Sequence, residues 1–218
     1  MNVIVYVEGP SDRNAMQALL KPLLERKRQS GVEIRFSPSP KGDKKETVLT
    51  KVPRMAVDII VNDPTSVVVA MPDLYPKNKS FPHETEHELK AGVWGRFESA
   101  LRSKNAADDD RLKQRFHVFC FKYDLEALVL AAEEELKQHL GASKLTKTWC
   151  EPVEDQDHGK PPKRIVEDLF RSHDKLYKGA VDAPAVLGRA DYEEIAAKCP
   201  QCFKPFVEFL ESCTAQAH

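Results

Sequence analysis

The chain has 218 residues, 41% of them hydrophobic, which is enough to bury the core of one large α/β domain or of a core domain with an appendage. Its 33 Lys and Arg residues against 34 Asp and Glu residues give a net charge of −1, which excludes a broadly basic nucleic-acid coat but leaves room for a local basic groove. No run of about 18 apolar residues occurs, and no basic and apolar leader precedes the first expected strand. We therefore expect a cytoplasmic protein without a membrane span.

The first segment, VIVYVEGPSD at residues 3–12, begins with apolar and β-branched residues and then turns sharply. It predicts a buried strand that delivers the carboxylate of Glu8 at its carboxyl end, followed by a helix that starts near Arg13 with Ser11 or Asp12 as its cap. Ligands of open α/β sheets bind outside the carboxyl ends of the strands, so Glu8 is expected in the functional crevice. The alternative is a strand-ending Glu that only faces water.

The next segments alternate between helix and strand. Apolar spacing predicts a helix over residues 12–27 that stops at Gly31, and VEIRF at residues 32–36 predicts an edge strand. The loop at residues 38–45 is rich in Pro, Ser, Gly and Lys, and is either a solvated connection or a phosphate-facing loop. A helix is expected over residues 46–61, with Pro53 in a first-turn or kink position.

SVVVAMPDLY at residues 66–75 repeats the design of the first strand. Its apolar half predicts a buried strand, and Asp73 appears just past the end of that strand. Two strand-end carboxylates of one parallel sheet, here Glu8 and Asp73, can converge on one cation. Carboxylate oxygens are the ligands that Mg²⁺ favours, so we predict a site for Mg²⁺ or Mn²⁺ at this edge.

These two strand ends resemble the Toprim domain of topoisomerases, primases and OLD-type nucleases. That family has a Glu-Gly pair after its first strand and an Asp-x-Asp after a later one. Here the pair is Glu8-Gly9 and the second mark is Asp73-Leu74-Tyr75, with Tyr75 where the family has its second Asp. The resemblance implies a Rossmann-like α/β core and a metal-dependent nuclease acting on nucleic acid, while Tyr75 departs from the standard metal pair.

Residues 83–87, His-Glu-Thr-Glu-His, match the HExxH zinc pattern at the start of a helix expected over residues 83–103. The pattern alone suggests a zinc hydrolase built on His83 and His87. Because this copy lies in an opening turn among further acids, we expect exposed helix-start residues instead. The five cysteines occur at irregular spacing and indicate reduced thiols, and the single CxxC at residues 199–202 supplies too few ligands for a structural zinc.

A fourth strand is expected over residues 115–121, after a solvated loop that holds three consecutive Asp residues. Three βα units followed by a fourth strand predict an α/β fold with a mainly parallel four-stranded sheet flanked by helices. The motif at residues 122–128, together with residues 161–165 and Cys199-Pro200, is similar to a bacterial family of unknown function with a Toprim-like core. Members of that family are often encoded beside an AAA-type ATPase, which implies such a partner and a role in bacterial defence.

The motif after the fourth strand places Asp124 and Glu126 at the same edge of the sheet as Glu8 and Asp73. Four carboxylates in one crevice repel one another unless a cation or basic side chains offset them. Lys163 and Arg164 at an expected helix start fit that need, and a helix start also offers backbone N–H groups to a phosphate. The alternative is that both lie on an ordinary exposed helix face.

The remaining chain predicts helices and loops, so we divide it into a Toprim-like core at residues 1–131 and a helical appendage at residues 132–218 that packs on the core. The predicted function is metal-dependent phosphoryl transfer, most plausibly by a nuclease. The alternative is a non-catalytic module that binds an ATPase or nucleic acid, and a zinc hydrolase is a distant third. The residues expected to act are Glu8, Asp73, Glu126 and Lys163 in catalysis; Glu8, Asp12, Asp73, Asp124 and Glu126 as metal ligands; and Gly9, Lys163 and Arg164 as the phosphate site.

Overall fold

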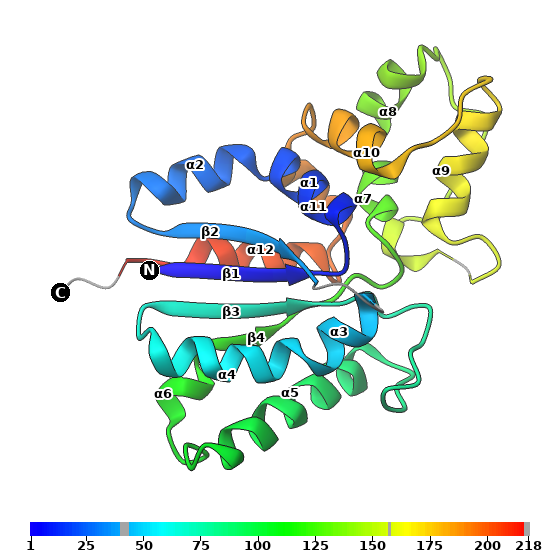
Figure 1. Cartoon of the computed structure of the whole chain (residues 1–218). Coiled ribbons are helices and arrows are strands. Elements are labelled where there is room, and N and C mark those ends of the chain that lie inside the picture. Colours follow the sequence, from blue (N-terminus) through cyan, green and yellow to red (C-terminus); the bar gives the residue numbers. More distant parts are fainter. Residues whose placement is uncertain (40–43, 157, 216–218) are drawn as a thin grey trace.

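The structure is a computed structural model that describes residues 1–39, 44–156 and 158–215 (Figure 1). Its centre is a single sheet with the strand order β2-β1-β3-β4, in which every pair of neighbours is parallel. The strands are β1 (Asn2–Val7), β2 (Glu33–Pro38), β3 (Ser66–Met71) and β4 (Phe116–Val118). The predicted α/β fold with a four-stranded parallel sheet is therefore confirmed, although β4 is shorter than the expected strand over residues 115–121.

The sheet is buried because helices cover both of its faces, which is the usual environment of parallel strands. All six residues of β3 are buried. Successive side chains of a strand point to opposite faces, so Val67 and Val69 belong to one apolar core, while Val68 and Ala70 belong to the other. Long β-branched runs therefore form these strands because both faces need apolar cover.

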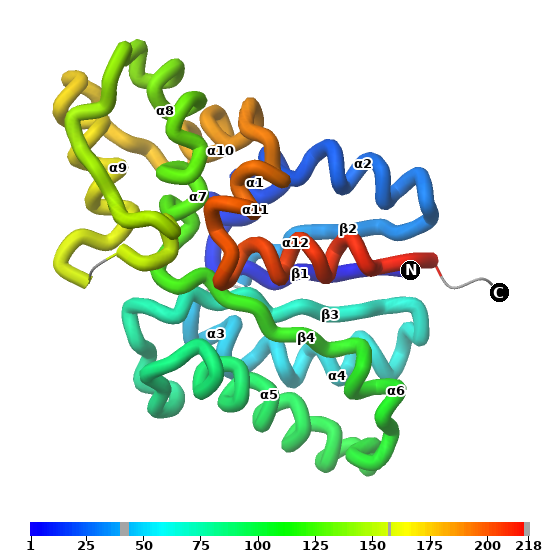
Figure 2. The backbone as a smooth tube through the Cα atoms, turned by 180° about the vertical axis from the view of Figure 1, so that it is seen from behind, coloured from blue at the N-terminus to red at the C-terminus, as the bar shows by residue number. Residues whose placement is uncertain are grey.

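One face is covered by α1 (Pro10–Leu19), α2 (Lys21–Gln29) and the last helix, α12 (Phe203–Ser212). Figure 2 shows α12 running along the sheet although it lies at the other end of the sequence. The Phe206 ring of α12 meets Phe36 of β2 edge to face, with ring centroids 6.3 Å apart. The C-terminal chain thus completes the cover of the core strands.

The opposite face is covered by α3 (Lys44–Thr50), α4 (Val52–Asn62) and α5 (Glu86–Ser103), with the short α6 (Asp110–Lys113) beside them. Phe97 of α5 stacks on Phe116 of β4 with ring centroids 4.3 Å apart. This contact fixes α5 against the edge strand of the sheet.

The remaining helices extend from the carboxyl-end edge of the sheet (Figure 1). They are α7 (Glu126–Ala131), α8 (Glu133–Leu140), α9 (Pro162–Arg171), α10 (Gly179–Leu187) and α11 (Tyr192–Lys198), with a 3-10 turn at Val153–Asp155. Their buried apolar residues belong to the same cluster as Val3, Val5 and Val7 of β1. The division of the chain at residue 131 stays a prediction. No helix within the described part of the chain is both long and apolar enough to cross a bilayer.

Proline explains where the expected helices divide, and Pro53 lies in a first turn as predicted. The helix predicted over residues 12–27 is two helices that meet at Leu20, and the one predicted over residues 46–61 breaks at Lys51. Pro22 and Pro53 lie in the first turns of the second halves, where a missing N–H costs nothing. Residues 40–43 of the expected basic loop lie outside the described residues.

Candidate metal-binding site

The strand order reverses direction between β1 and β3, since β2 lies on one side of this pair and β4 on the other. In open α/β sheets, the crevice at such a point, outside the carboxyl ends of the strands, is where ligands bind. Glu8 directly follows β1, and Asp73 follows β3. The arrowheads of both strands in Figure 1 point to this edge, where α1 and α7 begin.

A hydrogen bond joins the two strand ends. The Glu8 Oε1 atom accepts the backbone N–H of Asp73 at 3.0 Å. The Ser39 hydroxyl donates to the backbone oxygen of Glu8 at 3.0 Å, which ties the segment after β2 to the same edge. The two carboxylates predicted to share a cation are therefore neighbours.

Asp12 joins them from the first turn of α1. That helix starts at Pro10 with Gly9 as its N-cap, so the predicted start near Arg13 and the predicted cap at Ser11 or Asp12 are wrong. Instead, the Oδ2 atom of Asp12 accepts the backbone N–H of Gly9 at 2.8 Å. This bond holds the Asp12 carboxylate over the turn that follows Glu8.

Asp73 is in the least favourable place for a negative charge. Burial and then the nearby charges of Glu8, Asp12 and Asp124 raise the pKa of Asp73 well above its usual range, and Lys45 offsets this only in part. These surroundings favour the protonated form of the carboxyl group, and a bound cation would favour the charged form instead.

Asp124 and Glu126 follow β4 and complete the set. Burial, followed by the charge of Glu126, raises the pKa of Asp124 to about 7. The Oδ1 atom of Asp124 is buried without a hydrogen-bond partner among the described residues. Glu126 is only 8% exposed and accepts the hydroxyl of Tyr177 at 3.1 Å, and burial raises its pKa as well.

Lys163 supplies positive charge from the first turn of α9. Its charge lowers the pKa of Asp12, Asp124 and Glu126, though burial outweighs it at each. The backbone N–H of Lys163 donates to Asp124, so this helix start already serves a carboxylate of the protein. Lys163 and Arg164 are both exposed on this turn. Lys44, at the start of α3, is also exposed, and its Nζ would lie 3.4 Å from a Cβ atom added at Gly9.

The donor set suits a hard divalent cation. All five donors are carboxylates, several hold raised pKa values, and one buried oxygen lacks a partner. Within the described ranges, no three of these carboxylates bring one oxygen each to within 4.8 Å of one another. Mg²⁺ is usually bound through one or two carboxylates with waters and substrate phosphates in its remaining positions, so it does not require three converging carboxylates. Oxygen ligands of this kind also suit Mn²⁺.

Tyr75, in the place of the second acid, turns away from this set. Its hydroxyl donates to the backbone oxygen of Glu84 at 3.0 Å. Its ring packs on Tyr123 and on His158, with centroids 5.3 and 4.4 Å away. Asp124 lies near enough for its charge to raise the pKa of Asp73, so it is a candidate to take the place of the second Asp.

Two further residues contribute to the site without a recognisable sequence motif. Tyr177 lies in a loop without a motif, yet its hydroxyl holds Glu126. Lys45 was grouped with a basic loop, whereas it is buried in α3 and donates to the backbone oxygens of Leu74 and Pro76, directly after Asp73. Both roles depend on tertiary contacts that no local pattern encodes.

The HExxH match does not form the geometry that the zinc pattern requires. α5 begins at Glu86 with Thr85 as its cap, so His83 lies outside the helix that carries His87. His83 is buried at 3% exposure, which contradicts the expected exposed position, and its Nδ1 lies 3.0 Å from the backbone oxygen of Phe81. The two histidines therefore do not share one helix face.

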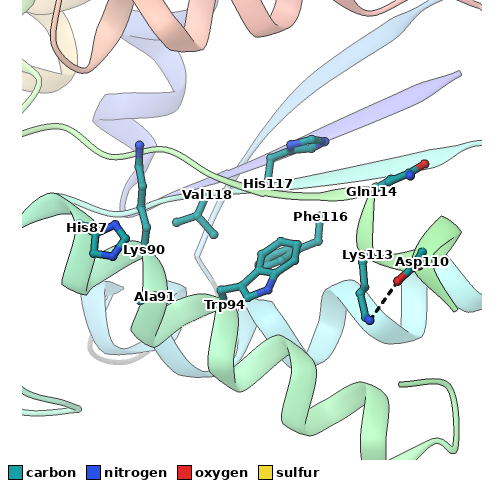
Figure 3. A pocket seen from close by; sticks show the side chains of 10 residues that line it. All are labelled: His87, Lys90, Ala91, Trp94, Asp110, Lys113, Gln114, Phe116, His117 and Val118. Carbon is teal, nitrogen blue, oxygen red and sulfur yellow. Dashed lines mark hydrogen bonds and ion pairs between the residues drawn. The ribbon is translucent and has the colours of Figure 1, made fainter. Parts of the chain in front are cut away.

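Two cavities lie away from the carboxylates. One, of about 620 Å³, opens between α5 and β4, where Trp94, Phe116 and His117 line it (Figure 3). The other, of about 660 Å³, lies at the amino ends of the strands beside Met1 and Thr65. Neither gathers the charges found at the carboxyl-end edge, so we place the candidate site at that edge.

The pattern of a family described as "Domain of unknown function (DUF4276)" matches residues 7–211. The chain belongs to this family. Among solved structures, the DUF4276 chain is similar to the C-terminal region of the Burkholderia pseudomallei OLD protein, with 17% sequence identity, a TM-score of 0.48 and 98% of each chain covered. No curated protein matches it.

Proposed function

We propose that the chain is a metal-dependent phosphoryl-transfer enzyme, most plausibly a nuclease acting on DNA or RNA. The observation that carries this proposal is the gathering of carboxylates at the point where the strand order reverses, with Glu8 bonded to the backbone of Asp73 and Asp124 close enough to raise its pKa. Carboxylates gathered in this way repel one another unless a cation offsets their charge. The nearby Lys163 ammonium can bind a phosphate.

Each residue has a role that follows from its contacts. Asp73 and Asp124 hold the cation, and Asp124 does so through the oxygen that lacks a partner. Glu8, fixed by the N–H of Asp73, either adds a ligand or takes the proton of the attacking water. When bound, a divalent cation would stabilise charge on the attacking and leaving oxygens.

The outer residues orient the substrate and the carboxylates. Tyr177 fixes Glu126 through its hydroxyl, and Asp12 holds the turn at Gly9. Lys163, together with Arg164 on the same exposed turn of α9, would bind the phosphate that is transferred. These roles rest on placement and charge.

A second candidate is a non-catalytic module that binds an ATPase or nucleic acid. Tyr75 favours it, because a phenol that donates to the backbone of Glu84 replaces the second Asp of the Toprim resemblance. An AAA-type ATPase partner and a role in bacterial defence, both implied by that resemblance, are compatible with either candidate and belong to this proposal.

Cleavage of labelled DNA and RNA, with Mg²⁺, with Mn²⁺ and with chelator, separates the two candidates. The enzyme predicts metal-dependent cleavage that is lost in Asp73→Asn and kept in Asp58→Asn, an exposed Asp on α4 whose partner is Lys104. A non-catalytic module predicts binding without cleavage under every metal condition. Lys163→Ala should weaken nucleic-acid binding in both cases.

A further inference from the structure

Three potential metal ligands meet at a second place, on the face of the sheet that carries α5. Cys120 lies two residues after β4, Cys202 caps α12, and Glu86 is the first residue of α5. One ligand atom from each lies within 4.8 Å of the other two, and no other group of three in the described part of the chain does this. Residues far apart in the sequence thus present two sulfurs and a carboxylate to one point.

The two thiols of this group are buried and form a hydrogen bond with each other. Cys120 and Cys202 are 1% and 4% exposed. The hydrogen bond that the Cys120 thiol makes with Cys202, followed by burial, raises the pKa of Cys120. Glu86 and Lys90 also act on the pKa of Cys120, Glu86 raising it and Lys90 lowering it. S–H groups are weak hydrogen-bond donors.

The backbone around Cys202 is held in place by a buried acid. Glu154 is 4% exposed, and its Oε1 accepts the backbone N–H of Cys202 at 2.8 Å and that of Phe203 at 3.1 Å, while its Oε2 accepts the N–H of Gln201 at 2.6 Å. Three such bonds fix the start of α12, so Cys202 is presented by a rigid turn.

Glu86 completes the set from the partly exposed side. Its carboxylate pairs with Lys90 one turn along α5, and both side chains are 34% exposed. The Lys90 ammonium also lies 5.6 Å from the centre of the Phe119 ring, and Figure 3 shows this side chain extending from α5 toward the segment after β4. Because the Glu86 carboxylate is partly exposed to solvent, a cation can reach the site from this side.

We propose that Glu86, Cys120 and Cys202 bind a thiophilic divalent cation, Zn²⁺, with a water in the fourth tetrahedral position. Thiolate ligands select Zn²⁺ and discriminate against the hard cations that suit the strand-end carboxylates. Zinc replaces one proton on each thiol, and both protons go to solvent. The ion, two thiolates and one carboxylate leave a single negative charge, which the Lys90 ammonium beside Glu86 balances.

This site draws on two sequence patterns that are incomplete separately. The CxxC at residues 199–202 contributes Cys202, and the HExxH match contributes Glu86, which is one of its unspecified positions. The third ligand, Cys120, comes from the end of the fourth strand. The zinc would tie α5, the end of β4 and the start of α12 together, independently of the strand-end carboxylates.

Cobalt(II) serves as the probe, because thiolate ligation gives it a near-ultraviolet charge-transfer band. We expect reduced, metal-free full-length protein to bind one Co²⁺ with this band and to lose the band when Zn²⁺ is added. Cys120→Ser and Cys202→Ser should each weaken binding by about 100-fold or more, at least as much as the loss of an outer partner of a ligand. Cys150→Ser, at an exposed cysteine, is the matched control and should leave binding unchanged.

A second readout guards against variants that do not fold. Zinc added to wild type in weak buffer should release protons, and Glu86→Gln, a substitution on the protein surface, should weaken Co²⁺ binding while keeping the thiolate band. The absence of a charge-transfer band in wild type, or a band that survives in Cys120→Ser and Cys202→Ser, overturns the proposal. Asp73→Asn should bind zinc as wild type does, because Asp73 is not a ligand of this site. A failure of the nuclease proposal can therefore be told apart from a failure of the zinc proposal.

Discussion

Replacing Asp124 by Asn should stabilise the metal-free protein as the pH rises. The folded protein holds a proton on Asp124 up to a pKa of about 7, whereas an unfolded chain releases it near the usual value of 3.8. Between these values the folded state binds more protons than the unfolded state, so the free energy of unfolding of the wild type falls as pH increases. Asn cannot ionise and escapes this loss.

The size of the effect follows from the width of that window. Between pH 5 and the pKa of about 7, two pH units at about 1.4 kcal/mol each give a relative gain for Asp124→Asn of about 3 kcal/mol by pH 8. In a chain of this length that is roughly 6–12 °C in Tm. The buried Asn amide that replaces the Asp124 carboxyl lowers the free energy of unfolding by about 1–3 kcal/mol at every pH. This cost cancels when the difference between variant and wild type at pH 8 is compared with that at pH 5.

Thermal unfolding with chelator present, followed by circular dichroism at pH 5 and pH 8, measures this gain. Asp155→Asn is the control, because the Lys122 ammonium beside Asp155 lowers the pKa of that carboxyl and keeps it ionised at both pH values. The difference in Tm between Asp155→Asn and wild type should not change with pH. A difference between Asp124→Asn and wild type that is also constant from pH 5 to pH 8 would refute the assignment of a buried, proton-holding Asp124.

Glu8→Gln and Asp73→Asn should each abolish metal-dependent cleavage while leaving the metal-free Tm unchanged or raised. Mg²⁺ should raise the Tm of wild type more than that of either variant. If both variants instead have a lower metal-free Tm and respond to Mg²⁺ as wild type does, the two carboxylates are structural. Gly92→Ala should destabilise by about 1–3 kcal/mol in denaturant unfolding, because the new Cβ atom would lie 2.2 Å from the Phe81 ring. Gly95→Ala, with nothing within 4 Å of its Cβ, should instead stabilise by about 0.5–1 kcal/mol, and equal signs for the two would contradict this packing.

The strands were predictable because their signal is local. VIVYV and SVVVAM are apolar on both faces, which fits a strand only when helices cover both sides, and the four expected strands appear in parallel order. The helix break at Leu20 is not predicted, because apolar spacing continues across it while Pro22 starts a new helix. The position of Pro53 in a first turn or kink is predicted, because proline has no N–H to donate inside a helix.

The carboxylates of the candidate site were predictable for a similar reason. Glu8 and Asp73 directly follow strand-like runs, and the carboxyl ends of parallel strands meet at one edge. The partners that set their chemistry were not predictable. The Tyr177 hydroxyl on Glu126 and the buried Lys45 come from segments whose sequence carries no motif, and only the packing of α3 and of the loop before α10 brings them in.

We infer that the strand-end carboxylates bind a hard divalent cation, and a calorimetric Mg²⁺ titration of the reduced 218-residue chain tests this claim. We expect saturable binding at or below millimolar Mg²⁺, tighter at pH 8 than at pH 6 because Asp124 must lose its proton. Asp73→Asn should weaken this binding strongly, whereas Asp58→Asn should keep it. Absence of Mg²⁺ binding at millimolar concentrations, with and without nucleic acid present, or equal binding by wild type and Asp73→Asn, would contradict the claim.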